Sequence, residues 1–185
     1  MHQEKLTILT LAIHNEKMGQ DFYVEAARRS FDEQGRNMFN HLAGMEEEHM
    51  RIFLAEYEAV QQGKDWLPSA EALARGKELD ITQLPPLGEV PKGVLLPPYI
   101  FPPSEEAPGI QGDIAALEYG LEMEEHSYNL YKDAMGKSTD PNARDIYARL
   151  RKEENEHYRV LQETHAYLSA NETWWDDWQK PFFTG

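Results

Sequence analysis

Two short stretches place a glutamate one helical turn before a histidine. "GMEEEHMRIF" contains Glu46 and His49, and "RKEENEHYRV" contains Glu154 and His157. Residues three apart on a helix project to the same side, so each pair could hold one metal ion. A single motif of this kind is weak evidence, because glutamate is common here and short motifs match by chance. The positions of these residues relative to the apolar pattern must therefore decide between a metal site and an ordinary solvated helix face.

Apolar residues recur with the period of a helix in four segments, and this pattern predicts four long helices. The predicted helices span residues 4–29, 33–61, 113–135 and 141–169. Each helix has one apolar stripe that advances by alternating steps of three and four residues. Six of the ionisable residues that interrupt these stripes are candidate metal ligands: Glu16, Glu46, His49, Glu124, Glu154 and His157. Other glutamates beside the motifs fall outside the stripes: Glu47, Glu48, Glu153 and Glu156.

The four segments also form an internal repeat with a constant offset in residue number. The same offset relates the six ionisable stripe residues in pairs without a gap: Glu16 with Glu124, Glu46 with Glu154, and His49 with His157. Each copy has one glutamate outside the Glu-x-x-His motif, which we call the lone glutamate: Glu16 in the first copy and Glu124 in the second. In both copies it therefore precedes the motif by the same interval. The chain is interpreted as two related helical hairpins in tandem.

Glutamates in all four apolar stripes would bring their carboxylates into one core. Burying an unpaired carboxylate costs several kcal/mol, and nearby like charges add to that cost. No lysine or arginine occupies the stripes at matching height. Two divalent cations would balance the charge, and mixed oxygen and nitrogen ligands suit iron or manganese, with zinc also possible. We predict that each Glu-x-x-His pair serves one ion of a metal pair, which Glu16 and Glu124 bridge or cap.

Composition limits the possible classes of protein. A chain of 185 residues is long enough for one domain with a sizeable core. The absence of cysteine excludes disulfides, iron–sulfur clusters and a rubredoxin-type iron centre. A net charge of −15 disfavours nucleic acid and anionic membrane as partners. The chain has no apolar run of the ~18 residues that a membrane helix needs, and no signal-peptide pattern, so a cytoplasmic protein is expected.

The connections predict an all-α four-helix bundle with a long crossover between helices 2 and 3. Short loops make the hairpins, at about 4–61 and 113–169, antiparallel. The crossover, about 62–112, contains a possible short helix in "PSAEALARGKEL" and then a proline-rich extended segment. Its length lets the third helix run parallel to the second. Asp140 before Pro141 predicts a helix cap, and Asp113 is a second candidate cap.

The bundle is expected to span residues 1–170, followed by an aromatic C-terminal tail at 171–185. The tail contains five large aromatic residues: Trp174, Trp175, Trp178, Phe182 and Phe183. Two interpretations stay open, because aromatic side chains favour both cores and interfaces. The tail either covers a flank of the bundle or binds a second subunit.

Three tyrosines follow the lone glutamates at helical spacing. Tyr128 lies one turn after Glu124, and Tyr131 and Tyr23 lie two turns after their glutamates. Each is a candidate near-site residue that hydrogen-bonds a metal ligand or passes electrons during catalysis. The alternative is an ordinary core aromatic.

The stretch "FNHLAGMEEEHMRIF" resembles the second-helix signature of the rubrerythrin-like branch of the ferritin-like superfamily, and the resemblance extends over all four helices. It implies a ferritin-like bundle that binds two iron ions and is often a homodimer. The six ionisable stripe residues take the ligand positions. Proteins of this branch reduce peroxide or oxidise ferrous iron, so H2O2 or O2 is the expected substrate and oxidative stress the expected setting.

The chain departs from that branch in two ways. Rubrerythrins carry a rubredoxin-like domain, which a cysteine-free chain cannot build, so an external electron donor is expected. They also carry an extra glutamate one turn before the third-helix ligand, where this chain has Leu121. The resulting site is more symmetric and less acidic than the peroxidase type. Ferroxidase chemistry, a di-manganese catalase-like enzyme and a non-catalytic iron-binding or structural bundle therefore stay open beside peroxidase chemistry.

Overall fold

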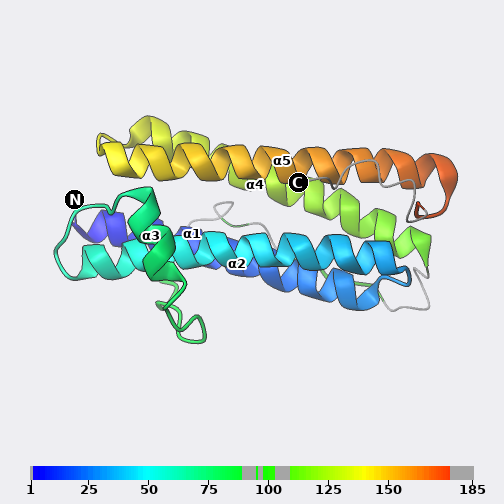
Figure 1. Ribbon diagram of the computed structural model, residues 1–185, viewed down its shortest axis with the longest axis horizontal. Coiled ribbons are helices and arrows are strands. Elements are labelled where there is room, and N and C mark those ends of the chain that lie inside the picture. The colour runs from blue at the N-terminus through cyan, green and yellow to red at the C-terminus, as the bar shows by residue number, and fades with distance from the viewer. Residues whose placement is uncertain (1, 89–94, 96–97, 103–108, 176–185) are drawn as a thin grey trace.

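The computed structural model describes residues 2–88, 95, 98–102 and 109–175, and these residues form helices and loops without a strand. The helices are α1 (His2–Arg29), α2 (Glu33–Gln61), α3 (Ser69–Gly76), α4 (Ile110–Lys137) and α5 (Pro141–Asn171). In Figure 1, α1 pairs with α2 and α4 pairs with α5, while the short α3 crosses α2 near one end. The chain returns to the other end of the bundle before α4, so α4 runs parallel to α2. The predicted bundle of two hairpins with a long crossover is confirmed.

The helix ends follow the capping residues that the sequence supplies. Asp32 caps α2 by accepting a hydrogen bond from the backbone N–H of Gln34. Asp140 caps α5 in the same way, with Pro141 in the first turn, so this predicted cap is confirmed. The predicted cap at Asp113 is wrong, because α4 begins three residues earlier, at Ile110. The Asp113 carboxylate instead ties two helix ends together, as the packing of the tail shows.

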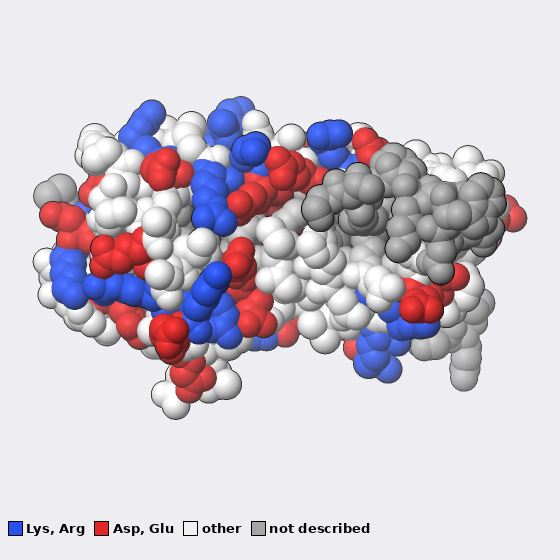
Figure 2. Space-filling view, in the orientation of Figure 1, with Lys and Arg blue, Asp and Glu red and all other residues white. Residues whose placement is uncertain are grey.

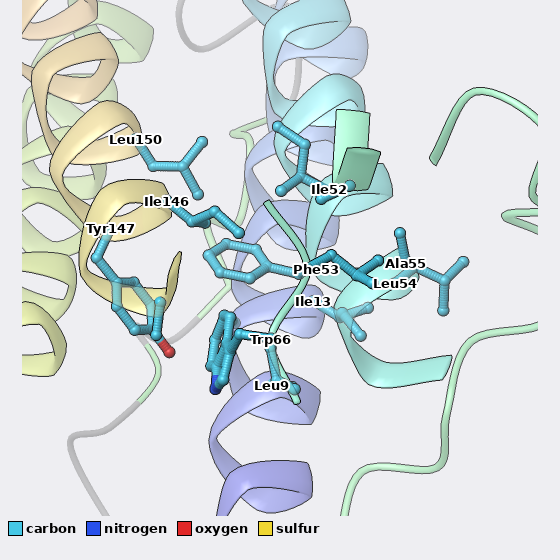
Figure 3. Close-up of a cluster of buried hydrophobic side chains, with 14 of the residues drawn as sticks. Leu9, Ile13, Ile52, Phe53, Leu54, Ala55, Trp66, Ile146, Tyr147 and Leu150 are labelled. Carbon is cyan, nitrogen blue, oxygen red and sulfur yellow. The ribbon is translucent and has the colours of Figure 1, made fainter. Parts of the chain in front are cut away.

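The apolar core has two parts, one in each half of the bundle, with a polar layer between them. One part contains Leu9, Phe53 and Leu150. Figure 3 shows this part, with Trp66 beside the ring of Tyr147 and several aliphatic side chains around them. The other part is built from residues nearer the opposite ends of the same four helices. All six ionisable stripe residues lie between the two parts, far from either end of the bundle.

The repeat extends into the segments that follow each hairpin. Trp66 follows α2 and contacts Tyr147 near the start of α5, with ring centroids 5.4 Å apart. Its equivalent in the second copy is Trp174, which follows α5 and packs against Gly35 near the start of α2. The Trp174 indole N–H donates to Asp113 at 2.8 Å, and the same carboxylate accepts from the Ser30 hydroxyl. Each hairpin thus sends a tryptophan onto the other hairpin.

The tail covers the bundle at its first aromatic residues. Trp174 and Trp175 are each only 4% exposed. For these two residues the interpretation as a covering segment therefore holds. Residues 176–185, which include Trp178, Phe182 and Phe183, lie outside the described residues.

We expect Gly35→Ala to lower the free energy of unfolding by about 1–3 kcal/mol, which is typical of overpacking. A Cβ at this position would clash first with the Ser30 hydroxyl and would lie 2.7 Å from the Trp174 ring. Gly44→Ala on the same helix is a matched control, because a Cβ there meets nothing within 4 Å. Alanine is the better helix former, so this control should stabilise the protein by up to about 1 kcal/mol. Urea unfolding of both metal-free variants measures the difference, and equal effects would contradict the packing of Trp174.

The surface carries many charged side chains, as expected from the net charge of −15. Figure 2 shows acidic and basic side chains interspersed over the visible face of the bundle. The structure contains no helix, within its described part, that is both long and apolar enough to cross a membrane.

Candidate metal centre

The structure brings all six ionisable stripe residues together in the middle of the bundle. Their side chains come from all four long helices, and each residue is at most 6% exposed. α1 contributes Glu16 and α4 contributes Glu124, while α2 and α5 each contribute a Glu-x-x-His pair: Glu46 with His49, and Glu154 with His157. The buried carboxylates that the apolar stripes implied are thus present in one layer.

These residues form two overlapping groups that are each suited to one metal ion. The first group is Glu16, Glu46, His49 and Glu154, and the second is Glu46, Glu124, Glu154 and His157. Within each group the candidate ligand atoms all lie within 4.8 Å of one another. Glu46 and Glu154 belong to both groups. The geometry therefore favours Glu46 and Glu154 as shared ligands, and Glu16 and Glu124 as caps of one position each.

Both imidazole rings turn their Nδ1 atoms toward carboxylates. His49 Nδ1 lies 3.1 Å from Glu154 Oε1 and 3.4 Å from Glu16 Oε2. His157 Nδ1 lies 3.4 Å from Glu124 Oε2 and 3.5 Å from Glu46 Oε1. The two rings are nearly parallel, with centroids 5.6 Å apart. Each histidine thus faces carboxylates of both hairpins, as a ligand of a shared centre should.

The centre is short of hydrogen-bond partners. Within the described chain, seven of its buried polar atoms have none: both carboxylate oxygens of Glu16 and of Glu154, Glu124 Oε2, and Nδ1 of His49 and of His157. No lysine or arginine in the same part of the chain forms an ion pair with the four carboxylates. An unsatisfied buried polar group costs about 1–3 kcal/mol, and a charged one more. Two metal ions with oxygen and nitrogen ligands would satisfy these atoms together, so the donor set fits a di-metal site.

Without metal, the centre retains protons. Burial raises the pKa of Glu16 well above its ordinary value, and the neighbouring carboxylates add to the shift. Burial also raises the pKa of Glu124, to about 7. Burial opposes the positive charge of His49 and His157, but the carboxylates around them outweigh it and hold both pKa values well above the usual range. Metal binding must therefore displace protons.

A second carboxylate fixes the orientation of His49. Glu153 Oε2 lies 3.1 Å from His49 Nε2, and Arg149 donates to the other Glu153 oxygen. A carboxylate on the outer nitrogen leaves Nδ1 for the metal and raises its basicity. Glu153 lies outside the apolar stripe of α5 and is only partly exposed. The sequence signal is weak, because this contact joins α5 to α2 and does not follow from either helix alone.

The three predicted near-site tyrosines have different surroundings. The Tyr23 hydroxyl donates to Glu124 Oε1 at 2.5 Å, so it contacts a candidate ligand directly. Tyr131 is fully buried among aromatic rings, and its hydroxyl has no hydrogen-bond partner among the described residues. Tyr128 is half-buried, with the Arg151 guanidinium 5.7 Å from the centre of its ring. Of these three tyrosines, only Tyr23 forms a hydrogen bond with the centre among the described residues.

The fold and the centre together define a ferritin-like helical bundle with a site suited to two metal ions. The family model described as Rubrerythrin matches residues 7–83, which hold α2 and all but the first turn of α1. This stretch, with Glu16, Glu46 and His49, is therefore similar to the rubrerythrin family, whose members are in general redox-active di-iron proteins. No curated protein and no solved structure matches the chain. The ligand candidates on α4 and α5 rest on the repeat and on the geometry.

Proposed function

We propose that the centre binds two iron ions and uses them to reduce hydrogen peroxide or dioxygen. The observation that carries this proposal is the presence of Glu46 and Glu154 in both ligand groups. Positions that share two carboxylates must be close together. A close pair of redox-active ions supplies two electrons and can clamp both oxygen atoms of a peroxide.

The residues of the chain divide the work of holding such a pair. Four carboxylates balance the charge of two divalent ions, and two imidazoles add nitrogen ligands that favour iron over calcium or magnesium. Glu153 orients His49, and Tyr23 orients Glu124. The burial of all six ligand candidates keeps bulk water away from the centre. These contacts hold the ligands in place before a substrate arrives.

Turnover requires electrons and protons from outside the centre. Reduction of one H2O2 to two H2O consumes two electrons and two protons. The chain has no cysteine and therefore no iron centre with thiolate ligands. We propose that a separate protein or small-molecule reductant returns the two electrons after each reaction.

The test is a comparison of peroxide and dioxygen as oxidants. Metal-free protein is loaded anaerobically with ferrous iron, and the bound iron per chain is measured. The reduced protein is then mixed rapidly with H2O2 or with O2, and the formation of ferric iron is followed in the near-ultraviolet. We expect two irons per chain and oxidation much faster than that of free ferrous iron. The faster oxidant identifies peroxidase or ferroxidase chemistry.

Two results would contradict the proposal. A protein that binds two irons but reacts no faster than free ferrous iron would be a non-catalytic iron-binding bundle. A manganese-loaded protein that releases O2 from H2O2, beside an inert iron form, would indicate a catalase-like enzyme. The manganese-loaded protein is therefore the matched control in the same experiment.

A further inference from the structure

The two halves of the centre have equivalent ligands but different surroundings. The internal repeat relates the ligands of the first half, Glu16 and His49, to those of the second half, Glu124 and His157. The residues that surround these ligands are not the same in the two copies. Positions where the two repeat copies have different residues therefore show where the surroundings of the two halves differ.

The first half is closed on its outer side by a hydrogen-bonded bridge between α1 and α2. Gln20, one turn after Glu16, donates to Glu47 Oε2 at 2.9 Å. The other oxygen of Glu47 accepts from Arg51 at 2.9 Å. These three side chains, which we call the Gln20 bridge, are joined across the groove between the two helices. Glu16 lines none of the four cavities described for this part of the chain.

The second half is open at the equivalent place. Tyr128 replaces Gln20 and Asn155 replaces Glu47, so the carboxylate that anchors the bridge is missing. Arg159, the equivalent of Arg51, pairs with Glu163 instead. The result is a solvent-open cavity of about 160 Å³, which we call the Tyr128 cavity, lined by Glu124, Glu125, Tyr128, Asn155 and Tyr158. Glu124 is the one ligand candidate that borders it.

A second cavity borders the centre but is much smaller. It lies between α1 and α4 and measures about 20 Å³, which is room for about one water molecule. The hydrogen bond from Asn15 to Ser127, 2.8 Å long, joins two of the residues that line it. The Tyr128 cavity has eight times this volume and is open to solvent.

We propose that small oxidants and anions of two or three heavy atoms reach the centre through the Tyr128 cavity, and therefore meet the Glu124–His157 half first. This inference rests on the proposed function and adds the route and the side of attack. The volume admits H2O2 or azide. The Arg151 guanidinium lies 5.7 Å from the centre of the Tyr128 ring, so one positive charge lies near the cavity.

The repeat supplies the variant that tests the route. Tyr128→Gln combined with Asn155→Glu gives the second half the same residue types as the Gln20 bridge, because Arg159 is already in place. The probe is azide added to the diferric protein, and the readout is the rate of the optical change on binding. We expect the rate to fall about tenfold or more, with two irons per chain retained; tenfold corresponds to about 1.4 kcal/mol in the barrier.

The reverse exchange is the matched control. Gln20→Tyr combined with Glu47→Asn removes the Gln20 bridge, and we expect azide to bind faster or to bind at an additional position. If the closing variant keeps two irons and binds azide at the wild-type rate, the route is elsewhere and the inference is wrong, while the proposed function stands. If the closing variant loses iron, the opening variant decides, and an unchanged azide rate there overturns the inference. A wild-type protein without an iron pair would overturn the proposed function itself.

Discussion

Glu154→Ala is expected to remove both metal ions from the centre, whereas Glu16→Ala is expected to remove one. Glu154 belongs to both ligand groups, and Glu16 belongs only to the group with His49. Loss of Glu154 therefore leaves three ligand candidates at each position and takes away a carboxylate that holds the two positions together. Loss of Glu16 leaves the group around His157 complete.

The measurement is metal content per chain after loading with excess iron and removal of loosely bound ions. Glu156→Ala is the control for the loss of one negative charge, because Glu156 lies on the exposed side of the same helix and pairs with Lys152. Glu153→Gln tests the outer hydrogen bond to His49, and loss of such a contact typically costs about 10–100-fold in metal affinity. Retention of one ion by Glu154→Ala would show that the two positions do not share this ligand.

Metal removal from the wild-type protein provides an independent measure of the same centre. A ligand that binds only the folded state stabilises it by mass action, so chelation should lower the melting temperature by many degrees. The Glu154→Ala variant should show no such dependence on chelator. A wild-type melting temperature that is insensitive to both iron and chelator would contradict a buried di-metal site.

The fold could be predicted because helical period, loop length and capping residues all act locally. The bounds of α2 agree with the apolar stripe, and Asp140 marks the start of α5. The positions of the six ligand candidates also follow from local information, because an acid in an apolar stripe must face the core. The repeat then relates the acids of one hairpin to those of the other. The topology of the bundle is the only further information that is needed to place the acids of one hairpin beside those of the other.

The remaining contacts depend on how the helices meet, which no single segment specifies. The Asp113 carboxylate, for which the sequence predicts a capping role, binds Trp174, whose position depends on the course of the chain after α5. Glu153 lies outside the stripe of α5 but reaches His49 on α2. Glu46 and Glu154 belong to both ligand groups because of how far α2 and α5 are rotated about their own axes. The helical period of the sequence does not define that rotation closely enough to predict the sharing.

Glu56 is a buried acid that the apolar stripe of α2 does not include, although it lies seven residues after His49 and three after Phe53. The neighbouring Tyr57 is partly exposed, whereas Glu56 is 0% exposed. Glu56 Oε2 accepts a hydrogen bond from the backbone N–H of Leu67 at 3.0 Å. Its other oxygen has no partner among the described residues.

We expect Glu56→Gln to stabilise the metal-free protein by a few kcal/mol at pH 9 and by little at pH 5. Burial raises the pKa of Glu56 from about 4.5 to about 8 in the folded state. A carboxyl group whose pKa is raised by folding contributes most to stability below its unfolded pKa, and this contribution is lost as pH rises through the folded pKa. The cost of ionisation therefore grows between about pH 4.5 and pH 8 in the wild-type protein. Glutamine keeps an oxygen that can accept from Leu67 but never ionises.

Urea unfolding of the metal-free variant and wild type between pH 5 and pH 9 measures this difference. The other buried acids titrate in both proteins, so their contribution cancels in the comparison. Glu58→Gln is the control for the change of a glutamate to glutamine, because Glu58 is exposed on the same helix. Thr164, the repeat equivalent of Glu56, is also 0% exposed, so the fold accepts a neutral side chain at the equivalent position in the other half of the bundle. If Glu56→Gln and wild type lose stability in parallel as pH rises, the Glu56 carboxylate must be solvated or paired in the folded protein, and its burial would not carry the cost of ionisation.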